Sequence, residues 1–231
     1  RELRCENPLL NLKLLGERNF GVSMAVLAIF GIGMLGGTYL LPLYMQKGLG
    51  YTAIMAGSVF LPVGLIQGVL STCSGFLTRY IKPLFIAVTG ILVMTLSFYF
   101  ASRFTLHTTH AQIMLVLYLR GFGMGLTFAP LNDFSLMNLS QRDMASAAGI
   151  SNSIKQLSGS VSIALLTVIL TGRTAFHSAQ GGLSSAESYV AGISDDFLFV
   201  TFVSLASALP FLWLLRPRRK AASFKSEGTG T

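Results

Sequence analysis

Residues Phe20–Met45 read FGVSMAVLAIFGIGMLGGTYLLPLYM and contain no charged side chain. A helix needs about 20 predominantly apolar residues to cross the hydrocarbon core of a bilayer. Because lipid offers no partner for backbone N–H and C=O groups, a crossing segment has to satisfy them internally, as an α-helix does. This stretch therefore predicts a membrane-spanning α-helix.

Five more apolar blocks follow the first. Together they predict six spans, at Phe20–Met45, Thr52–Thr78, Leu84–Ala101, Gln112–Ala129, Met144–Leu170 and Phe197–Leu215. Of the 231 residues, 52% are hydrophobic and 11% are charged, whereas soluble domains carry about 25% charged residues. The mean hydropathy is +0.64. The predicted fold is therefore all-α, a polytopic membrane protein that lies in a lipid bilayer.

The basic residues predict which side of the membrane each loop faces. Polar residues dilute the fifth span, so its assignment depends on this pattern. With six spans and the amino end inside, the outer loops carry only Lys47, Arg103 and Arg173, and the basic run at 216–220 lies inside. That distribution follows the positive-inside rule. The formal net charge of +8 then reflects topology, and we expect no nucleic-acid partner.

This topology divides the chain into a cytoplasmic linker (1–19), a six-helix bundle (20–215) and a basic cytoplasmic tail (216–231). The outer loop Thr171–Asp196 is rich in Gly, Ser and Ala, which predicts little structure of its own. Residues Asn7–Asn19 form either a short interfacial helix or a plain leader into the first span. The sequence opens with Arg-Glu-Leu-Arg rather than Met, so we expect a piece of a longer protein.

Several motifs argue against an enzyme. The pattern G-x-G-x-x-G at Gly31–Gly36 lies in the middle of a span, where glycines favour helix contact rather than dinucleotide binding. No P-loop occurs. His107, His110 and His177 lie in predicted outer loops, so we expect no metal site, and the predicted spans contain no His, Asp or Glu. Intramembrane catalysis would need such residues, so we expect neither an enzyme nor a cofactor.

Two cations lie deep in the predicted spans. Arg120 is about 12 Å into the fourth span and Lys155 about 16 Å into the fifth, at 1.5 Å per residue. A charge at this depth costs at least about 2.5–3.5 kcal/mol, so it usually faces a cavity or a partner. A structural role, in which Arg120 pins helices through backbone carbonyls, remains open. Because the predicted spans offer no acid, the counter-charge must come from a substrate, from water or from a missing part of the protein.

The fifth span combines Lys155 with small polar residues. Ser151, Lys155, Ser158 and Ser162 are spaced four, three and four residues apart, which places them on one helix face. Such a face is suited to lining a wet cavity. Small residues at this spacing also favour close helix packing, so the pattern leaves lining and packing open.

Four motifs in order resemble one known family. They are NPLLNLKL at Asn7–Leu14, LPLYMQ at Leu41–Gln46, RGFGMG at Arg120–Gly125 and KQLSGS at Lys155–Ser160. Their order and spacing are similar to the carboxy-terminal half of fourteen-helix major facilitator drug:proton antiporters. Lys155 stands where the family has arginine, and Ser158 where it has glycine. Arg79 stands where the superfamily often has an acid, which argues against a gating salt bridge in that loop.

The resemblance implies one six-helix half-bundle of a major facilitator fold, in the plasma membrane (the inner membrane of bacteria). Its partner would be the amino-terminal transmembrane half of the same protein, which also holds most of the family's proton-carrying acids. The implied function is secondary active transport, a proton-coupled multidrug efflux by alternating access of small lipophilic or anionic substrates.

The resemblance also implies roles for particular residues. Arg120 would lie in the central cavity and orient substrate or tune an acid of the partner half. Lining or bracing of the fifth helix would fall to Lys155, Ser151, Asn152 and Gln156. Helix kinks are expected at Pro42, Pro62 and Pro130. Helix packing would fall to Gly121, Gly123, Gly125, Ser158 and Ser162.

Two other functions fit the sequence. A transporter of the same fold could carry an anionic metabolite, a siderophore or a lipid, because buried cations without buried acids favour anions. A six-helix structural or channel-forming subunit would fold and act alone, without an upstream half.

Overall fold

The structure is a computed structural model that describes residues 12–136, 139–141, 143–179, 182 and 184–210. Its long elements are α1 (Arg18–Leu43), α2 (Ala53–Leu77), α3 (Pro83–Ala101), α4 (His110–Leu136), α5 (Met144–Ala179) and α6 (Ser185–Ala206). A 3-10 helix, η2 (Leu12–Gly16), precedes α1, and a π-helix, η3 (Tyr44–Gly48), follows it. All six α-helices are long and apolar enough to cross a membrane. The predicted all-α, six-span fold class is therefore confirmed.

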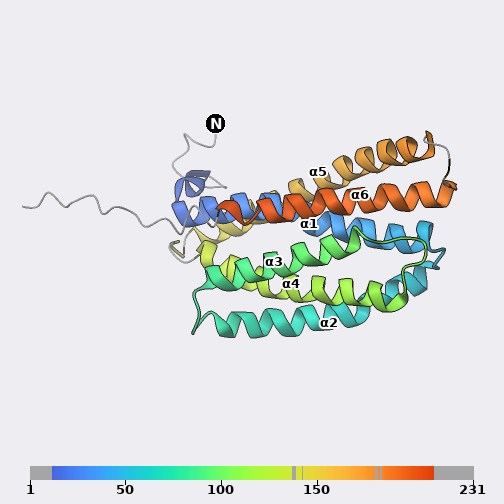
Figure 1. Cartoon of the computed structure of the whole chain (residues 1–231). Coiled ribbons are helices and arrows are strands. Elements are labelled where there is room, and N and C mark those ends of the chain that lie inside the picture. The colour runs from blue at the N-terminus through green and yellow to red at the C-terminus, as the bar shows by residue number, and fades with distance from the viewer. Residues whose placement is uncertain (1–11, 137–138, 142, 180–181, 183, 211–231) are drawn as a thin grey trace, which may run out of the picture.

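The six helices lie alongside one another in one bundle (Figure 1). Helices α2 and α5 lie at opposite edges, with α1, α3, α4 and α6 between them. Helix α4 packs on α2 and α3, while α1 packs on α5 and α6. In the most apolar 18-residue stretch, 56% of α1 is buried but only 17% of α2 and 28% of α5. The two edge helices therefore present the most surface to lipid or to further protein.

Local sequence signals explain where several helices begin. Thr52 caps α2, since its hydroxyl accepts a hydrogen bond from the backbone N–H of Met55 at 3.3 Å. Helix α6 begins with a capping box, in which Ser184 and Glu187 satisfy each other's backbone N–H groups. Helix α3 begins at Pro83, whose fixed φ suits the first helical turn.

Prolines lie inside three helices, at Pro42 in α1, Pro62 in α2 and Pro130 in α4. Each lacks the backbone N–H that would bond to the carbonyl four residues earlier. The π-helix η3 begins two residues after Pro42. Helix α4 continues six residues beyond Pro130 to Leu136, whereas the sequence predicted a span ending at Ala129.

The prediction of a long unstructured outer loop at Thr171–Asp196 is wrong. Helix α5 continues to Ala179 and α6 begins at Ser185. Two contacts join these helices in the extended part, where Asp195 on α6 accepts a hydrogen bond from Arg173 at 2.7 Å and binds His177 at 2.8 Å. The described part of α6 thus begins twelve residues before the predicted sixth span.

Parts of the sequence-based predictions lie outside the described residues. These are residues 1–11 of the linker, including the first five residues of the Asn7–Asn19 segment, the end of the sixth span at Leu215, and the basic tail 216–231. Within the described part, Leu14 of η2 is buried. It packs with the protein core, rather than facing lipid as an interfacial helix would require.

Candidate functional site

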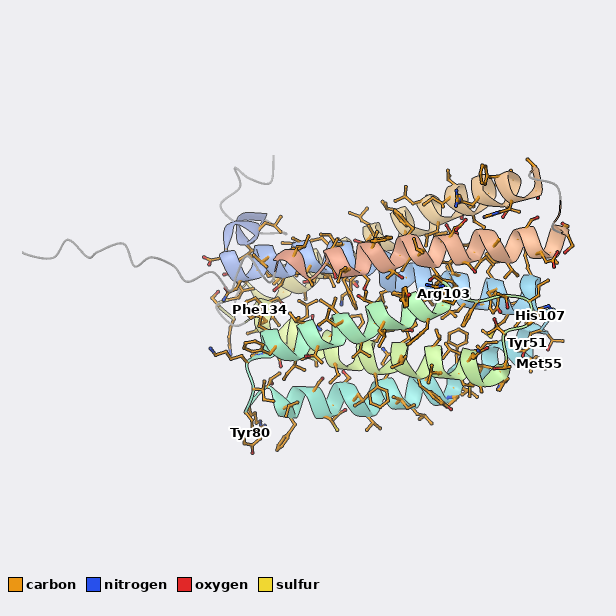
Figure 2. The ribbon with its side chains drawn as sticks, viewed as in Figure 1. Tyr51, Met55, Tyr80, Arg103, His107 and Phe134 are labelled. Atoms are coloured by element: carbon orange, nitrogen blue, oxygen red, sulfur yellow. The ribbon has the colours of Figure 1, made fainter. Side chains whose placement is uncertain are left out.

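The two ends of the bundle are distinguished by their loops. Figure 2 shows Tyr51, Met55 and His107 at one end and Tyr80 and Phe134 toward the other. The sequence predicts the first end to face outward and the second to face the cytoplasm. The polar residues that the sequence singled out lie at several levels between these ends.

Arg120 joins α4 to α1. Its Nη2 donates to the carbonyl oxygen of Met34 at 3.1 Å and to the hydroxyl of Thr38. The Thr38 hydroxyl in turn donates to the same Met34 carbonyl at 2.9 Å. Gly37 gives this contact its space, because a Cβ there would lie 2.4 Å from Phe98 and 3.5 Å from Nε of Arg120.

The guanidinium of Arg120 is buried but close to a surface. Arg120 is 3% exposed, whereas Thr38, its hydroxyl partner, is exposed. The Nε atom is buried and has no hydrogen-bond partner, and the ion pairs of the described residues do not include Arg120. The Nε donor is therefore buried and unsatisfied in this conformation.

Lys155 lies on a groove between α4 and α5. The groove has a volume of about 630 Å³ and is lined by Asn132, Ser135, Leu136, Ala148, Gly149, Ser151, Asn152 and Lys155. The Lys155 ammonium lies 5.3 Å from the centre of the Phe128 ring, a distance at which the ring face attracts a cation. The described ion pairs do not include Lys155. The groove thus offers amide, hydroxyl and ammonium groups without an acid on its lining.

The serine pattern of α5 divides between two faces. Ser162 donates to the carbonyl of Ile32 on α1 at 2.7 Å, and Ser158 is the nearest group to Gly31, where a Cβ would lie 3.0 Å away. These two serines therefore lie in the α1–α5 contact. Ser151 belongs to both faces, since it lines the groove and its hydroxyl lies 3.4 Å from the sulfur of Met24.

Asn152 and Gln156 are both exposed on α5. Asn152 lines the groove beside Lys155, whereas Gln156 is not among the lining residues. The structure therefore brings Ser151, Asn152 and Lys155 together. Arg120 lies twelve residues before Asn132 on α4, about 18 Å along the helix axis, and bonds to α1 instead. Sequence reasoning grouped all of these residues around one pathway.

The glycines of the RGFGMG motif face two neighbouring helices. Gly121 and Gly125 lie against α2, near Val63 and Leu70, while Gly123 lies against α3. A Cβ at Gly123 would lie 2.8 Å from both the Gly90 carbonyl oxygen and Met94. The motif thus lets α4 approach both helices closely, as small residues do in membrane bundles.

Sequence reasoning missed the α4 wall of the groove. Asn132 and Ser135 line it, and Asp133 accepts a hydrogen bond from Thr78 at 3.3 Å at the end of α2. These residues follow Pro130, which we interpreted as the end of the span. The available signal was the helical spacing of Asn132 and Ser135, three residues apart.

Acids and histidines also lie closer to the bundle than predicted. His177 is in α5, not in a loop, and binds Asp195. His107 and Glu187 line one pocket of about 240 Å³, at the end of the bundle that the sequence predicts to face outward. Asp196 on α6 is 0% exposed. The prediction that the bundle holds buried cations but no buried acid is therefore wrong. The described residues contain no group of three or more His, Cys, Asp or Glu that could hold a metal.

Comparison with known proteins decides the family. Residues 3–163 match the family model described as Major Facilitator Superfamily. The chain belongs to the major facilitator superfamily. This assignment confirms the resemblance drawn from the four motifs, all of which lie within the matched range.

The relatives of this facilitator chain are transporters. It is 32% identical over 180 residues to the uncharacterized MFS-type transporter YhcA of Bacillus subtilis, covering 78% of this chain and 34% of YhcA. It is 31% identical over 180 residues to the multidrug export protein EmrB of Haemophilus influenzae, covering 78% and 35%. It is 26% identical over 222 residues to the lincomycin resistance protein LmrB of Listeria innocua, covering 94% and 47%. The chain thus spans a third to a half of the length of these relatives.

Proposed function

We propose that this chain is the carboxy-terminal half of a proton-coupled exporter that moves small lipophilic compounds by alternating access. Relatives named for multidrug export and lincomycin resistance support export, and their greater length supports a missing half. Facilitators of this superfamily are built from two six-helix halves that rock about a site between them. On this proposal the chain is not an enzyme, it lies in the plasma membrane, in bacteria the inner membrane, and both of its ends are cytoplasmic.

The groove between α4 and α5 is the observation that carries this proposal. It is open and has a volume of about 630 Å³. The two helices that line it, α4 and α5, are each long enough to cross a membrane. Ligand sites of transporters combine an apolar wall with a few polar groups that orient the ligand. Phe128, Leu136 and Ala148 supply apolar surface here. The missing half would close the groove into a cavity.

Arg120 would act at a second position on this pathway. Its bond to the exposed Thr38 holds α4 against α1. When the halves rock, α1 and α4 would shift near their prolines, and the free donor Nε would become available to substrate or to an acid of the other half. Pro42 and Pro130 lie beyond the Arg120 contact on each helix.

The charge of Lys155 favours a second candidate, an anionic substrate of the metabolite, siderophore or lipid classes. Its ammonium faces an aromatic ring rather than a carboxylate. An unpaired cation on an open groove attracts anions. The third candidate, a six-helix structural or channel subunit, would have to act without a second half, whereas the chain covers only 34–47% of its relatives.

Transport by the complete protein in liposomes tests these functions. The membrane potential is clamped, a pH gradient is imposed, and uptake is measured for tetraphenylphosphonium, a lipophilic cation, and for oleate, an anionic lipid. Multidrug export predicts proton-driven uptake of tetraphenylphosphonium. The anionic candidate predicts uptake of oleate that falls at least about tenfold in Lys155→Gln.

A matched control separates local from general charge effects. Lys47→Gln removes an exposed cation that lies over Tyr189 at the outer end, away from the groove. Its uptake should equal that of the wild type. If the wild type moves neither probe under a pH gradient, proton-coupled export is refuted. Full activity of the chain expressed alone would favour the third candidate, the structural or channel subunit.

A further inference from the structure

Asp196 is a buried acid in the middle of α6, a helix long and apolar enough to cross a membrane. It lies eleven residues after Ser185, the first residue of α6, which is about 16 Å along the helix axis. Its side chain is 0% exposed. Neither of its carboxyl oxygens, Oδ1 or Oδ2, has a hydrogen-bond partner.

The neighbouring charges do not compensate Asp196. Arg173 and His177 of α5 both bind Asp195, the adjacent residue, which faces Asp196 as a like charge. Tyr189 also interacts electrostatically with Asp196 and with Tyr39 of α1, and its ring is approached by Lys47 of η3. Helix α3, which also packs on α6, brings Phe98 to the adjacent Phe197. Arg173 and His177 therefore contact Asp195, and Lys47 contacts Tyr189, whereas none of them is paired with Asp196.

An ionised carboxylate in such a place would be very unfavourable. Transfer of an unpaired carboxylate from water to an apolar interior costs so much that the group takes up a proton instead. Ionisable residues inside membranes are rare for this reason, and they commonly mark proton relays. Asp196 is therefore the neutral acid in the conformation described.

Helix α6 lies close against α5 one turn before this carboxyl. Gly192 lies one turn before Asp196, and a Cβ there would lie 2.6 Å from the hydroxyl oxygen of Thr174 on α5. Side chains of a helix lean toward its amino end, so the Asp196 carboxyl leans toward this close crossing. The Thr174 hydroxyl is itself buried without a partner. Separation of α5 from α6 here would hydrate both groups.

We propose that Asp196 binds a proton in the closed arrangement of α5 and α6 and gives it to water when these helices separate during transport. The O–H bond of the carboxyl breaks, the proton passes to water as hydronium, and the carboxylate is solvated in the opened contact. Closure reverses the step. This inference rests on the proposed proton-coupled transport, and it identifies where in this half the coupling proton is bound.

Infrared spectroscopy of the complete transporter in lipid nanodiscs tests protonation directly. A protonated carboxyl has a C=O stretch separate from that of a carboxylate. At neutral pH, wild type minus Asp196→Asn should show one protonated-carboxyl band, and wild type minus Asp195→Asn should not. Asp195→Asn is the matched control because it changes the adjacent, paired acid. Absence of the band from the Asp196→Asn difference spectrum would overturn the proposal.

Transport assays test coupling separately. Asp196→Asn mimics the neutral acid, so it should retain exchange of tetraphenylphosphonium across the membrane without a gradient, which also shows that it folds. Its accumulation driven by a pH gradient should fall at least about tenfold. Proton-driven accumulation equal to that of the wild type would overturn the inference, as would a wild type driven by sodium alone. A wild type that is driven by neither ion would instead refute the proposed function.

Discussion

Arg173 of α5 donates from Nε to Oδ2 of Asp195 of α6 at 2.7 Å, and this ion pair links the last turns of α5 to the middle of α6. His177, one turn further along α5, reaches the same oxygen at 2.8 Å. Both contacts lie in the part of α5 beyond Leu170, the predicted end of the fifth span. They also leave Asp196, the next residue, without a cation.

The Arg173–Asp195 pair should contribute little to stability. The two side chains are 46% and 30% exposed, and exposed ion pairs are screened by water and salt. A double-mutant cycle of Arg173→Gln and Asp195→Asn should give a coupling energy close to zero at physiological salt, measured by thermal unfolding in detergent. A coupling that persists at high salt would show that the pair is shielded by lipid or by the missing half.

Gly123 should be a sensitive glycine of the α3–α4 contact. In Gly123→Ala the new methyl group would lie 2.8 Å from the Gly90 carbonyl oxygen and from Met94, so the helices would have to separate. We expect a loss of about 1–3 kcal/mol in the free energy of unfolding, measured by titration with a denaturing detergent. Gly68→Ala is the control, because nothing lies within 4 Å of a Cβ there. It should be neutral or stabilising by up to about 1 kcal/mol.

Hydropathy was sufficient to predict the six spans but not where the helices end. Past Leu170 the sequence becomes polar and small, which predicts a loop. The helix nevertheless continues to Ala179 and packs on α6, where Arg173 and His177 have a partner in Asp195. That partner is 18–22 residues away in sequence, so no local signal indicates it. Helix α4 also continues past its predicted end, because the one backbone hydrogen bond lost at Pro130 does not terminate it.

Spacing predicted helix faces well but could not say what each face meets. Ser158 and Ser162 share a face with Lys155, yet α1 covers the serines while Lys155 borders the groove. Only the position of α1 decides which of these side chains is covered by a helix and which borders the groove. Asp196 is likewise buried, while the adjacent Asp195 binds Arg173 and His177 of α5. The adjacent acids Asp195 and Asp196 look equivalent in sequence.

The hydrogen bond from Ser162 to Ile32 should stabilise the α1–α5 contact. Ser162 is 0% exposed and its hydroxyl donates across the helix interface at 2.7 Å. Interhelical hydrogen bonds in membranes contribute about 0.6 kcal/mol on average and up to about 1.7. Ser162→Ala should therefore lower the free energy of unfolding by about 1 kcal/mol in the same detergent titration.

Ser160→Ala provides the matched comparison. Its hydroxyl is exposed and bonds to the Gln156 carbonyl of the same helix at 3.1 Å. Because this bond joins no second helix, its removal should leave stability unchanged within error. Equal effects of the two substitutions would mean that the α1–α5 contact depends on apolar packing alone.

Thr38 should control how firmly Arg120 is held. In Thr38→Val the hydroxyl that accepts from Nη2 is replaced by a methyl group of similar size, so the guanidinium keeps only the Met34 carbonyl. We expect a loss of about 1.5 kcal/mol, the low end for a hydrogen bond to a charged group, because Thr38 is exposed. Thr72→Val is the control, since its hydroxyl bonds only within α2, to Gly68 at 3.1 Å.

Substitution of Arg120 itself separates bracing from transport. Arg120→Lys keeps the positive charge but replaces the planar guanidinium with a single ammonium group. That group cannot bond Thr38 and present a separate N–H donor in the same geometry. If Arg120 acts on the pathway, Arg120→Lys and Arg120→Ala should both lose proton-driven flux in the complete transporter, at least about tenfold, while membrane insertion stays normal. Thr38→Val should then retain flux, because the guanidinium is still present and more readily released. If Thr38→Val instead loses as much flux as Arg120→Ala, the bond between α1 and α4 is what transport requires, and Arg120 serves as a brace.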